Sequence, residues 1–315
     1  MKSTLPGVLA AFVGGLGGAV QSRINAGLAG HLHDGVAAAL VSNVVALTLV
    51  TVAVAVAPSA RAGLRLVVTG LRRGTLRARE CVGGACGALY VASQGISAGT
   101  LGLAVFTVAV VAGQTGGGLA VDRAGIAPGG SRAVTGPRVL GAALTVAAVV
   151  VAADGRLRAG ASPALALLPL LAGVGLAVQG AVNGRVQRAA GAVLPAVFLN
   201  AVVGTAALLL AFGAVVLVRG RPGGSLPDQP WLYAGGAIGA CFTAIGVAVV
   251  RRIGVLLLGL AVIAGQLTGA MALDLIAPGP AGPPGVAGLV GVELTLVAVL
   301  IGARPRLLVR RGHRC

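Results

Sequence analysis

Four amide side chains stand in two matching pairs inside long apolar stretches of the sequence. Gln21 and Asn25 are four residues apart, and Gln179 and Asn183 repeat that spacing. Side chains four residues apart share one face of a helix. An amide in hydrocarbon needs a hydrogen-bonding partner, so each pair predicts a helix face turned towards the interior of a bundle. There the amides would either bind a polar substrate or join neighbouring helices.

Five further amides lie in apolar stretches. Gln114 and Gln266 each stand between glycines, and Asn43 and Asn200 lie at equivalent places in the second expected helix of each half. Gln94 lies in a polar stretch whose counterpart in the second half is apolar, which favours a role in ligand binding over a role in the fold. The expected lining of a substrate cavity is therefore Gln21, Asn25, Asn43, Gln94, Gln114, Gln179, Asn183, Asn200 and Gln266.

Three carboxylates are candidates for coupling and gating. Glu293 lies well inside an apolar stretch, where a lone carboxylate is costly unless it faces a cavity or is neutral. It is the candidate for proton coupling, unless its helix begins later and Glu293 is interfacial. Asp122 and Asp274 each close an apolar stretch and are gate candidates, or else ordinary interfacial charges.

Other chemistry has little support in the sequence. His31 and His33 fall in a short connection, which is weak evidence for a metal, and we expect neither a metal nor a cofactor. Lys2 is the only lysine, so a phosphate-binding Walker A sequence is absent. No nucleophile–base pair appears within the apolar stretches, so we do not expect an enzyme.

The composition indicates what positions these side chains. Of the 315 residues, 57% are hydrophobic and only 10% are charged, and the mean hydropathy is +0.99. A soluble domain carries about 25% charged residues. The chain therefore predicts an all-α, polytopic membrane protein.

About ten stretches are long enough to span a membrane. They cover residues 5–28, 35–57, 81–98, 100–121, 137–153, 163–184, 192–218, 231–250, 253–276 and 286–303. Most arginines fall in alternate connections, so the positive-inside rule predicts a multi-pass protein of the cytoplasmic membrane with both termini cytoplasmic. The net charge of +17 then favours contact with the anionic inner leaflet and not with nucleic acid. Segment 59–80 predicts either an amphipathic helix on that leaflet or a plain basic loop.

The sequence repeats itself. GGACGALYVASQ at 83–94 parallels GGAIGACFTAIG at 235–246, and VVAGQTGGGLAVD at 110–122 parallels VIAGQLTGAMALD at 262–274. These matches predict two five-helix transmembrane repeats, 1–154 and 160–304, followed by a basic cytoplasmic tail, 305–315. Because five is odd, the second repeat enters the membrane from the opposite side. Inverted repeats are typical of secondary transporters, whose binding site lies between the repeats near the membrane midplane.

The duplicated five-helix unit resembles the drug/metabolite transporter superfamily. The similarity rests on Q-x-x-x-N in the first helix of each repeat and on A-G-Q ending in Asp in the fourth, at 112–122 and 264–274. The chain is most similar to the branch of YdcZ-type integral membrane proteins. This resemblance implies ten helices, cytoplasmic termini, a central cavity and secondary transport of a small metabolite or drug-like compound, more often by export.

We therefore expect a secondary active transporter that works by alternating access, driven by a proton or another ion. Its partners would be a small-molecule substrate and the lipid bilayer, and a homo-oligomer is compatible with the sequence. Two other classes remain open. The repeats could enclose a continuous channel, or the chain could be a non-transporting scaffold subunit.

Overall fold

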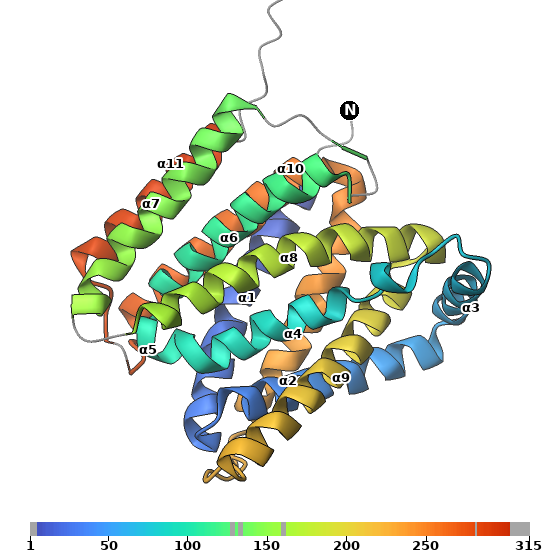
Figure 1. Cartoon of the computed structure of the whole chain (residues 1–315), viewed down its shortest axis with the longest axis horizontal. Helices are drawn as coiled ribbons and strands as arrows, with labels where there is room; N and C mark the ends of the chain where they lie inside the picture. The colour runs from blue at the N-terminus through green and yellow to red at the C-terminus, as the bar shows by residue number, and fades with distance from the viewer. Residues whose placement is uncertain (1–4, 127–129, 132–134, 159–161, 281, 303–315) are drawn as a thin grey trace, which may run out of the picture.

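The computed structural model describes residues 5–126, 130–131, 135–158, 162–280 and 282–302, and these residues form helices with no strand. Figure 1 shows the helices packed as one bundle. The helices are α1 (Leu5–Leu32), α2 (Gly35–Val56), α3 (Pro58–Arg72), α4 (Gly83–Ser93), α5 (Gly99–Leu101), α6 (Leu103–Ala124), α7 (Gly136–Arg158), α8 (Pro163–Ala190), α9 (Val193–Arg219), α10 (Ala234–Ile276) and α11 (Val286–Gly302). Short turns η1 (Ala78–Glu80), η2 (Gln94–Ala98, a π-helical turn) and η3 (Pro230–Tyr233) complete the described structure.

The expected membrane architecture is confirmed. Five of the described helices (α1, α2, α6, α8 and α9) are long and apolar enough to cross a membrane, and shorter apolar helices cover Gly136–Ala152, Ala261–Ile276 and Val286–Ile301. Large apolar side chains such as Leu210 and Leu217 are exposed on the outside of the bundle. A surface of this kind suits lipid rather than water. The predicted tail at 305–315 lies outside the described residues.

Local sequence signals explain several helix ends. The Asp34 side chain accepts a hydrogen bond from the backbone N–H of Ala37 at 2.6 Å, which caps the start of α2. Ser162 caps α8 in the same way. Gly125 and Gly191 end α6 and α8 in the left-handed conformation, with φ of 66° and 69°, which glycine adopts without a steric penalty.

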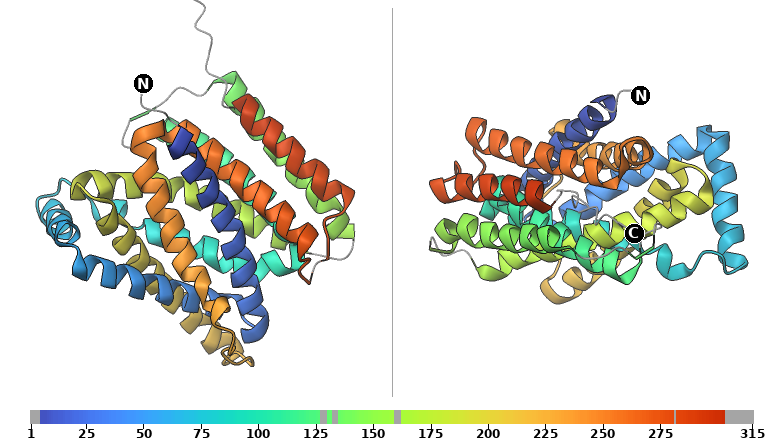
Figure 2. Two further views of the ribbon diagram at one scale, coloured as in Figure 1. Left: turned by 180° about the vertical axis from the view of Figure 1, so that it is seen from behind. Right: turned by 90° about the horizontal axis from the view of Figure 1, so that it is seen from above.

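The two repeats interlock. Helix α1 of the first repeat packs against α10 of the second, and α8 of the second packs against α4 and α6 of the first. Helices α2 and α9 pair across the repeats, as do α7 and α11, which lie side by side at the edge of the bundle in both Figure 1 and Figure 2. The interior is therefore built mainly from contacts between the repeats.

Helix α10 contains two of the predicted spans. Its first half lies against α1 in the antiparallel sense, since Gly235 faces Asn25 while Gly239 faces Gln21. Its second half runs parallel to α1, because Gly265 faces Phe12 while Gly269 lies against Leu16 and Ala19. The chain therefore reverses direction within α10, as Figure 2 shows, and encloses α1 between its halves.

The basic segment after α2 forms a helix, as one of the two readings of 59–80 predicts. Ala60, Gly63 and Val67 of α3 are buried, and the helix packs on α8 and α9. The side chains of Arg61 and Arg65 are exposed on the opposite side. In the right-hand view of Figure 2, α3 lies across the end of the bundle, nearly perpendicular to the other helices.

Candidate functional site

A small central cavity of about 70 Å³ lies between the repeats. It is lined by residues of α1, α2, α4, α8, α9 and α10: Gln21, Ser42, Asn43, Ala46, Val50, Gly87, Tyr90, Val91, Leu176, Gln179, Val197, Asn200, Ala201, Gly236, Gly239, Ala240, Phe242 and Thr243. All of the polar side chains in this set are uncharged. The cavity can therefore offer hydrogen bonds and aromatic surface to a ligand without an opposing charge.

More than half of the lining residues come in pairs that the two repeats relate. The pairs are Gln21 with Gln179, Asn43 with Asn200, Gly87 with Gly239, Tyr90 with Phe242, and Val91 with Thr243. Both repeats thus contribute matching residues to the cavity. In transporters built from inverted repeats, the substrate site lies between the repeats.

Glycines give the cavity amides room. A Cβ at Gly87 would lie 3.0 Å from Oε1 of Gln179, and a Cβ at Gly239 would lie 2.5 Å from Nε2 of Gln21. Each glycine therefore lets a glutamine of the opposite repeat approach the helix backbone. Oε1 of Gln179 and Oγ of Ser42 are buried and have no hydrogen-bond partner among the residues that the structure describes. Buried polar atoms are nearly always paired, so these two acceptors are suited to a ligand.

Three buried side chains separate the central cavity from a second hollow. Asn25 Nδ2 donates to Gln94 Oε1 at 2.6 Å, and Gln94 Nε2 donates to Ser22 Oγ at 2.9 Å. We call these three residues the amide bridge. Gln94 is fully buried and opens the π-helical turn η2. Such turns often mark functional sites, because they interrupt the regular hydrogen-bond ladder of a helix.

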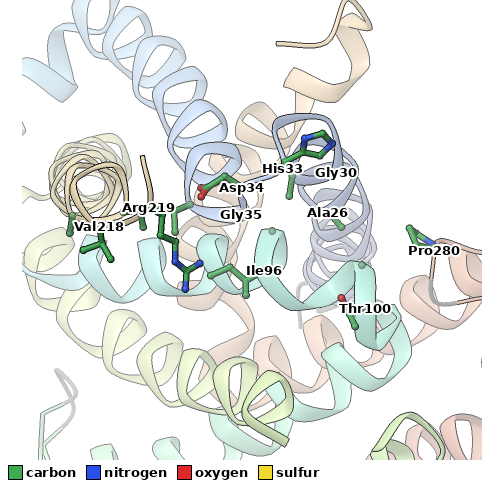
Figure 3. A pocket seen from close by; sticks show the side chains of 16 residues that line it. Ala26, Gly30, His33, Asp34, Gly35, Ile96, Thr100, Val218, Arg219 and Pro280 are labelled. Carbon is green, nitrogen blue, oxygen red and sulfur yellow. The ribbon is translucent and has the colours of Figure 1, made fainter. Parts of the chain in front are cut away.

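The second hollow is a wide pocket of about 990 Å³ at the turn between α1 and α2. We call it the α1–α2 pocket; it is lined by Ala26, Ala29, Gly30, His33, Asp34, Gly35, Val36, Gly95, Ile96, Gly99, Thr100, Ala214, Val215, Val218, Arg219 and Pro280. Figure 3 shows the Arg219 side chain reaching towards Ile96 from α9. Along α1, and again along α4 and η2, the residues that line the central cavity come first. The residues of the amide bridge follow them, and the residues that line the α1–α2 pocket come last.

Two glycines bring the walls of this pocket together. A Cβ at Gly95 would lie 2.6 Å from the carbonyl oxygen of Gly35, and a Cβ at Gly35 would lie 2.7 Å from the carbonyl carbon of Gly95. The start of α2 therefore crosses η2 with the two backbones in contact. This crossing lies beside the amide bridge and closes the same end of the cavity.

The predicted cavity residues separate into two groups. Gln21, Asn43, Gln179 and Asn200 line the central cavity. The remaining five do not line it: Asn25, Gln94, Gln114, Asn183 and Gln266. Asn25 and Gln94 form the amide bridge, and Gln114 is half-buried on α6.

The asparagines also join helices, as the structural alternative predicted. Asn43 Nδ2 donates to Thr205 Oγ1 at 2.8 Å and to the carbonyl oxygen of Ala201 at 3.2 Å. Asn183 Nδ2 donates to Asn200 Oδ1 at 3.0 Å. Substrate binding and helix joining are therefore compatible at this cavity.

The Asp274 side chain lies at the start of α6, which is far from Asp274 in the sequence. Its side chain is 2% exposed, and it pairs with Arg23 of α1 at 2.8 Å. Its second oxygen accepts a hydrogen bond from the backbone N–H of Ala104 at 2.8 Å, in the first turn of α6. Gly102, with φ of 81°, interrupts the helical backbone conformation just before that turn. Asp274 thus joins three helices near the end of the bundle that holds the α1–α2 pocket.

Asp122 lies in a second set of ion pairs. It pairs with Arg138 at the start of α7, while Arg185 of α8 pairs with Glu80 and donates to the carbonyl oxygen of Gly125 at 3.0 Å. The hydrogen bond from the backbone N–H of Arg77 and the pairing with Arg185 lower the pKa of Glu80. The two predicted gate candidates therefore each belong to an inter-helix contact.

Glu293 lies away from the central cavity. Its side chain is exposed on α11, which packs against α7 at the edge of the bundle. The sequence could not reveal this, because α11 is apolar on all sides and has no polar face that marks its orientation.

Several residues of the candidate site and its surroundings were not singled out from the sequence. Tyr90 and Phe242 could have been found, because the aligned repeats place an aromatic residue at both positions. Arg23 lies between Gln21 and Asn25 but on another side of α1, where its partner comes from a distant helix. No local signal indicates that partner.

Comparison with known proteins finds a family whose profile covers most of the chain. The chain matches the profile of a family described as "Putative inner membrane exporter, YdcZ" twice, over residues 6–151 and 164–301. No curated protein matches the chain.

Proposed function

Because the chain belongs to the YdcZ family of membrane transporters, we propose that it exports a small, uncharged polar compound by alternating access between its two repeats. The observation that carries this proposal is the position of the central cavity. It lies between the two repeats, and matching residues of both repeats line it. If the repeats are inverted, as the sequence predicts, a site between them can face either side of the membrane when they rock against each other.

The chemistry of the lining supports an uncharged substrate. Amides, hydroxyls and two aromatic rings surround the cavity, and they include the free acceptors on Gln179 and Ser42. A hydrogen-bond donor on the substrate would satisfy these acceptors. A charged substrate would lose its hydration in exchange for uncharged groups, which is costly.

The amide bridge is the proposed gate at one end of the cavity. It consists of side-chain hydrogen bonds and lies between the cavity and the α1–α2 pocket. The distribution of arginines predicts that this pocket opens to the outside of the cell. Release of the bridge would then connect the cavity with the exterior. The proposal assigns no coupling role to Glu293, because that side chain does not line the cavity.

We predict that Gln179→Leu weakens ligand binding about fivefold. The variant keeps most of the side-chain volume but removes one hydrogen bond, worth about 1 kcal/mol. The measurement is a thermal-shift titration of purified protein in detergent with a panel of uncharged polyols, amides and nucleosides, since a ligand of the native state raises its apparent stability. Each hit is then repeated with Gln179→Leu and Gln21→Leu.

Gln114→Leu is the matched control, because Gln114 does not line the cavity. It should leave the affinity unchanged. Binding that is insensitive to both cavity glutamines, or a panel in which only charged compounds bind, would contradict the proposed substrate class.

A further inference from the structure

Helix α3 and the turn that follows it are rich in arginine. Six exposed arginines lie in this segment: Arg61, Arg65, Arg72, Arg73, Arg77 and Arg79. Residues 58–79 include no acidic residue, and the whole chain has only seven acidic residues against 24 basic ones. Glu80, which follows this segment, already pairs with Arg185 of α8. A partner for most of this positive charge is therefore expected from outside the chain.

The side chains of α3 form three stripes along the helix. The buried stripe is Ala60, Gly63, Val67 and Gly70. A second stripe, the apolar flank, is exposed or half-buried and consists of Leu64, Val68 and Leu71. A third, the arginine stripe, is exposed and consists of Arg61, Arg65 and Arg72. With about 3.6 residues per turn, the apolar flank lies between the buried stripe and the arginine stripe.

The orientation of α3 matches that of a helix at a membrane surface. Figure 1 shows α3 at one end of the bundle, nearly along its own axis, and Figure 2 shows it crossing the ends of the longer helices. A helix perpendicular to the spanning helices lies parallel to the plane of the membrane. The distribution of arginines predicts that this end of the bundle is cytoplasmic. The leaflet on that side is rich in anionic phospholipid.

We propose that α3 binds anionic phospholipids of the inner leaflet, with the phosphates on the arginine stripe and the acyl chains against the apolar flank. A guanidinium group binds phosphate oxygens through two parallel hydrogen bonds. Clusters of about four to eight basic residues on an amphipathic helix are typical of binding to anionic lipid. A soluble phosphate would leave the apolar flank in water, whereas a phospholipid covers both stripes.

The buried stripe connects this lipid site with the second repeat. α3 directly follows α2 of the first repeat, but it packs on the turn between α8 and α9. A Cβ at Gly63 would lie 2.7 Å from Cγ of Pro195 and 2.9 Å from the carbonyl oxygen of Ala190. Helices α8 and α9 carry Gln179 and Asn200 to the central cavity. Lipid bound to α3 therefore stabilises a contact between the repeats at the cytoplasmic end.

A lipid titration tests the site. The full chain in a neutral detergent is titrated with phosphatidylglycerol, and its apparent melting temperature is recorded, because a ligand of the native state raises that temperature. We expect a clear rise with phosphatidylglycerol and little rise with phosphatidylcholine of the same acyl chains. Arg61→Gln with Arg65→Gln should move the midpoint to about 25-fold more lipid, since each arginine near an anionic surface contributes about fivefold.

Two controls separate this site from general effects of charge. Arg219→Gln with Arg221→Gln removes two exposed arginines at the other end of α9 and should leave the midpoint unchanged. Glycerol phosphate, which carries the phosphate without acyl chains, should not raise the melting temperature. The proposal is overturned if glycerol phosphate replaces the lipid, if phosphatidylcholine acts as well as phosphatidylglycerol, or if the α3 variant keeps its midpoint.

Fluorescence quenching in vesicles tests the position of the apolar flank. In a background whose four cysteines are replaced by serine, a fluorophore is attached at Val68→Cys of the apolar flank or at Ala62→Cys, which lies on the other side of the arginine stripe. The vesicles contain phosphatidylglycerol and a lipid with a nitroxide on the upper acyl chain. The label at position 68 should be quenched several-fold more than the label at position 62. Equal quenching at the two positions would contradict contact between the apolar flank and the acyl chains.

Discussion

Asp274→Ala should destabilise the protein by about 3 kcal/mol. The substitution leaves Arg23 without its 2.8 Å partner, and it removes the acceptor for the backbone N–H of Ala104. Loss of one member of a buried ion pair leaves the other charge unpaired in a low dielectric. Loss of a cap at a helix start adds about 1 kcal/mol in typical cases. The effect should therefore exceed that of an ordinary surface charge.

The measurement is the free energy of unfolding in mixed micelles, titrated with a denaturing detergent. Asp122→Ala is the control, because its pair with Arg138 is more exposed, and it should cost about 1 kcal/mol or less. The double variant Arg23→Leu with Asp274→Ala should cost less than the sum of the single changes. Equal effects at Asp122 and Asp274 would contradict a structural role for the buried pair.

Gly113→Ala should destabilise the protein, whereas Gly116→Ala on the same helix should not. A Cβ at Gly113 would overlap the carbonyl oxygen of Leu170 in α8, while nothing lies within 4 Å of a Cβ at Gly116. Overpacking in a tight contact costs about 1–3 kcal/mol. Alanine in place of an unhindered helical glycine gains up to about 1 kcal/mol. The two variants should therefore have opposite signs.

The same detergent titration measures both variants. Gly265→Ala tests the second repeat, because its Cβ would overlap the carbonyl oxygen of Phe12 in α1. It should behave like Gly113→Ala. If Gly113→Ala proves as stable as Gly116→Ala, the close crossing of α6 and α8 is wrong.

The internal repeat explains how much of the site the sequence could predict. Gln21 and Gln179 lie at matching places in the two repeats, and both line the central cavity. Tyr90 and Phe242 follow from the same alignment. By contrast, the hydrogen bond between Asn25 and Gln94 joins two residues that are 69 positions apart in the sequence. Only the packing of α1 against η2 determines it, and no local pattern encodes that packing.

Uniformly apolar helices limit sequence analysis in another way. In a soluble protein the polar face of a helix shows which side is buried. α11 has no such face, so the sequence could not distinguish a cavity position from an exposed one for Glu293. Gln114 illustrates the same limit. Its neighbour Gly113 contacts α8, but the Gln114 side chain does not line the cavity, and the apolar sequence around it could not show this.

Two-sided labelling of the central cavity tests alternating access most directly. Ala240 lines the cavity, so Ala240→Cys in a background without other cysteines reports its accessibility to a membrane-impermeant maleimide. The label is applied separately to each side of the membrane. The same measurement is repeated with Gln94→Leu, which removes both hydrogen bonds of the amide bridge.

We predict that Gln94→Leu raises the labelling rate from the outside and lowers it from the cytoplasm. Release of one gate in an alternating-access transporter shifts the population away from the state that opens on the other side. A rise from the outside with no change from the cytoplasm would indicate a continuous channel and contradict the account.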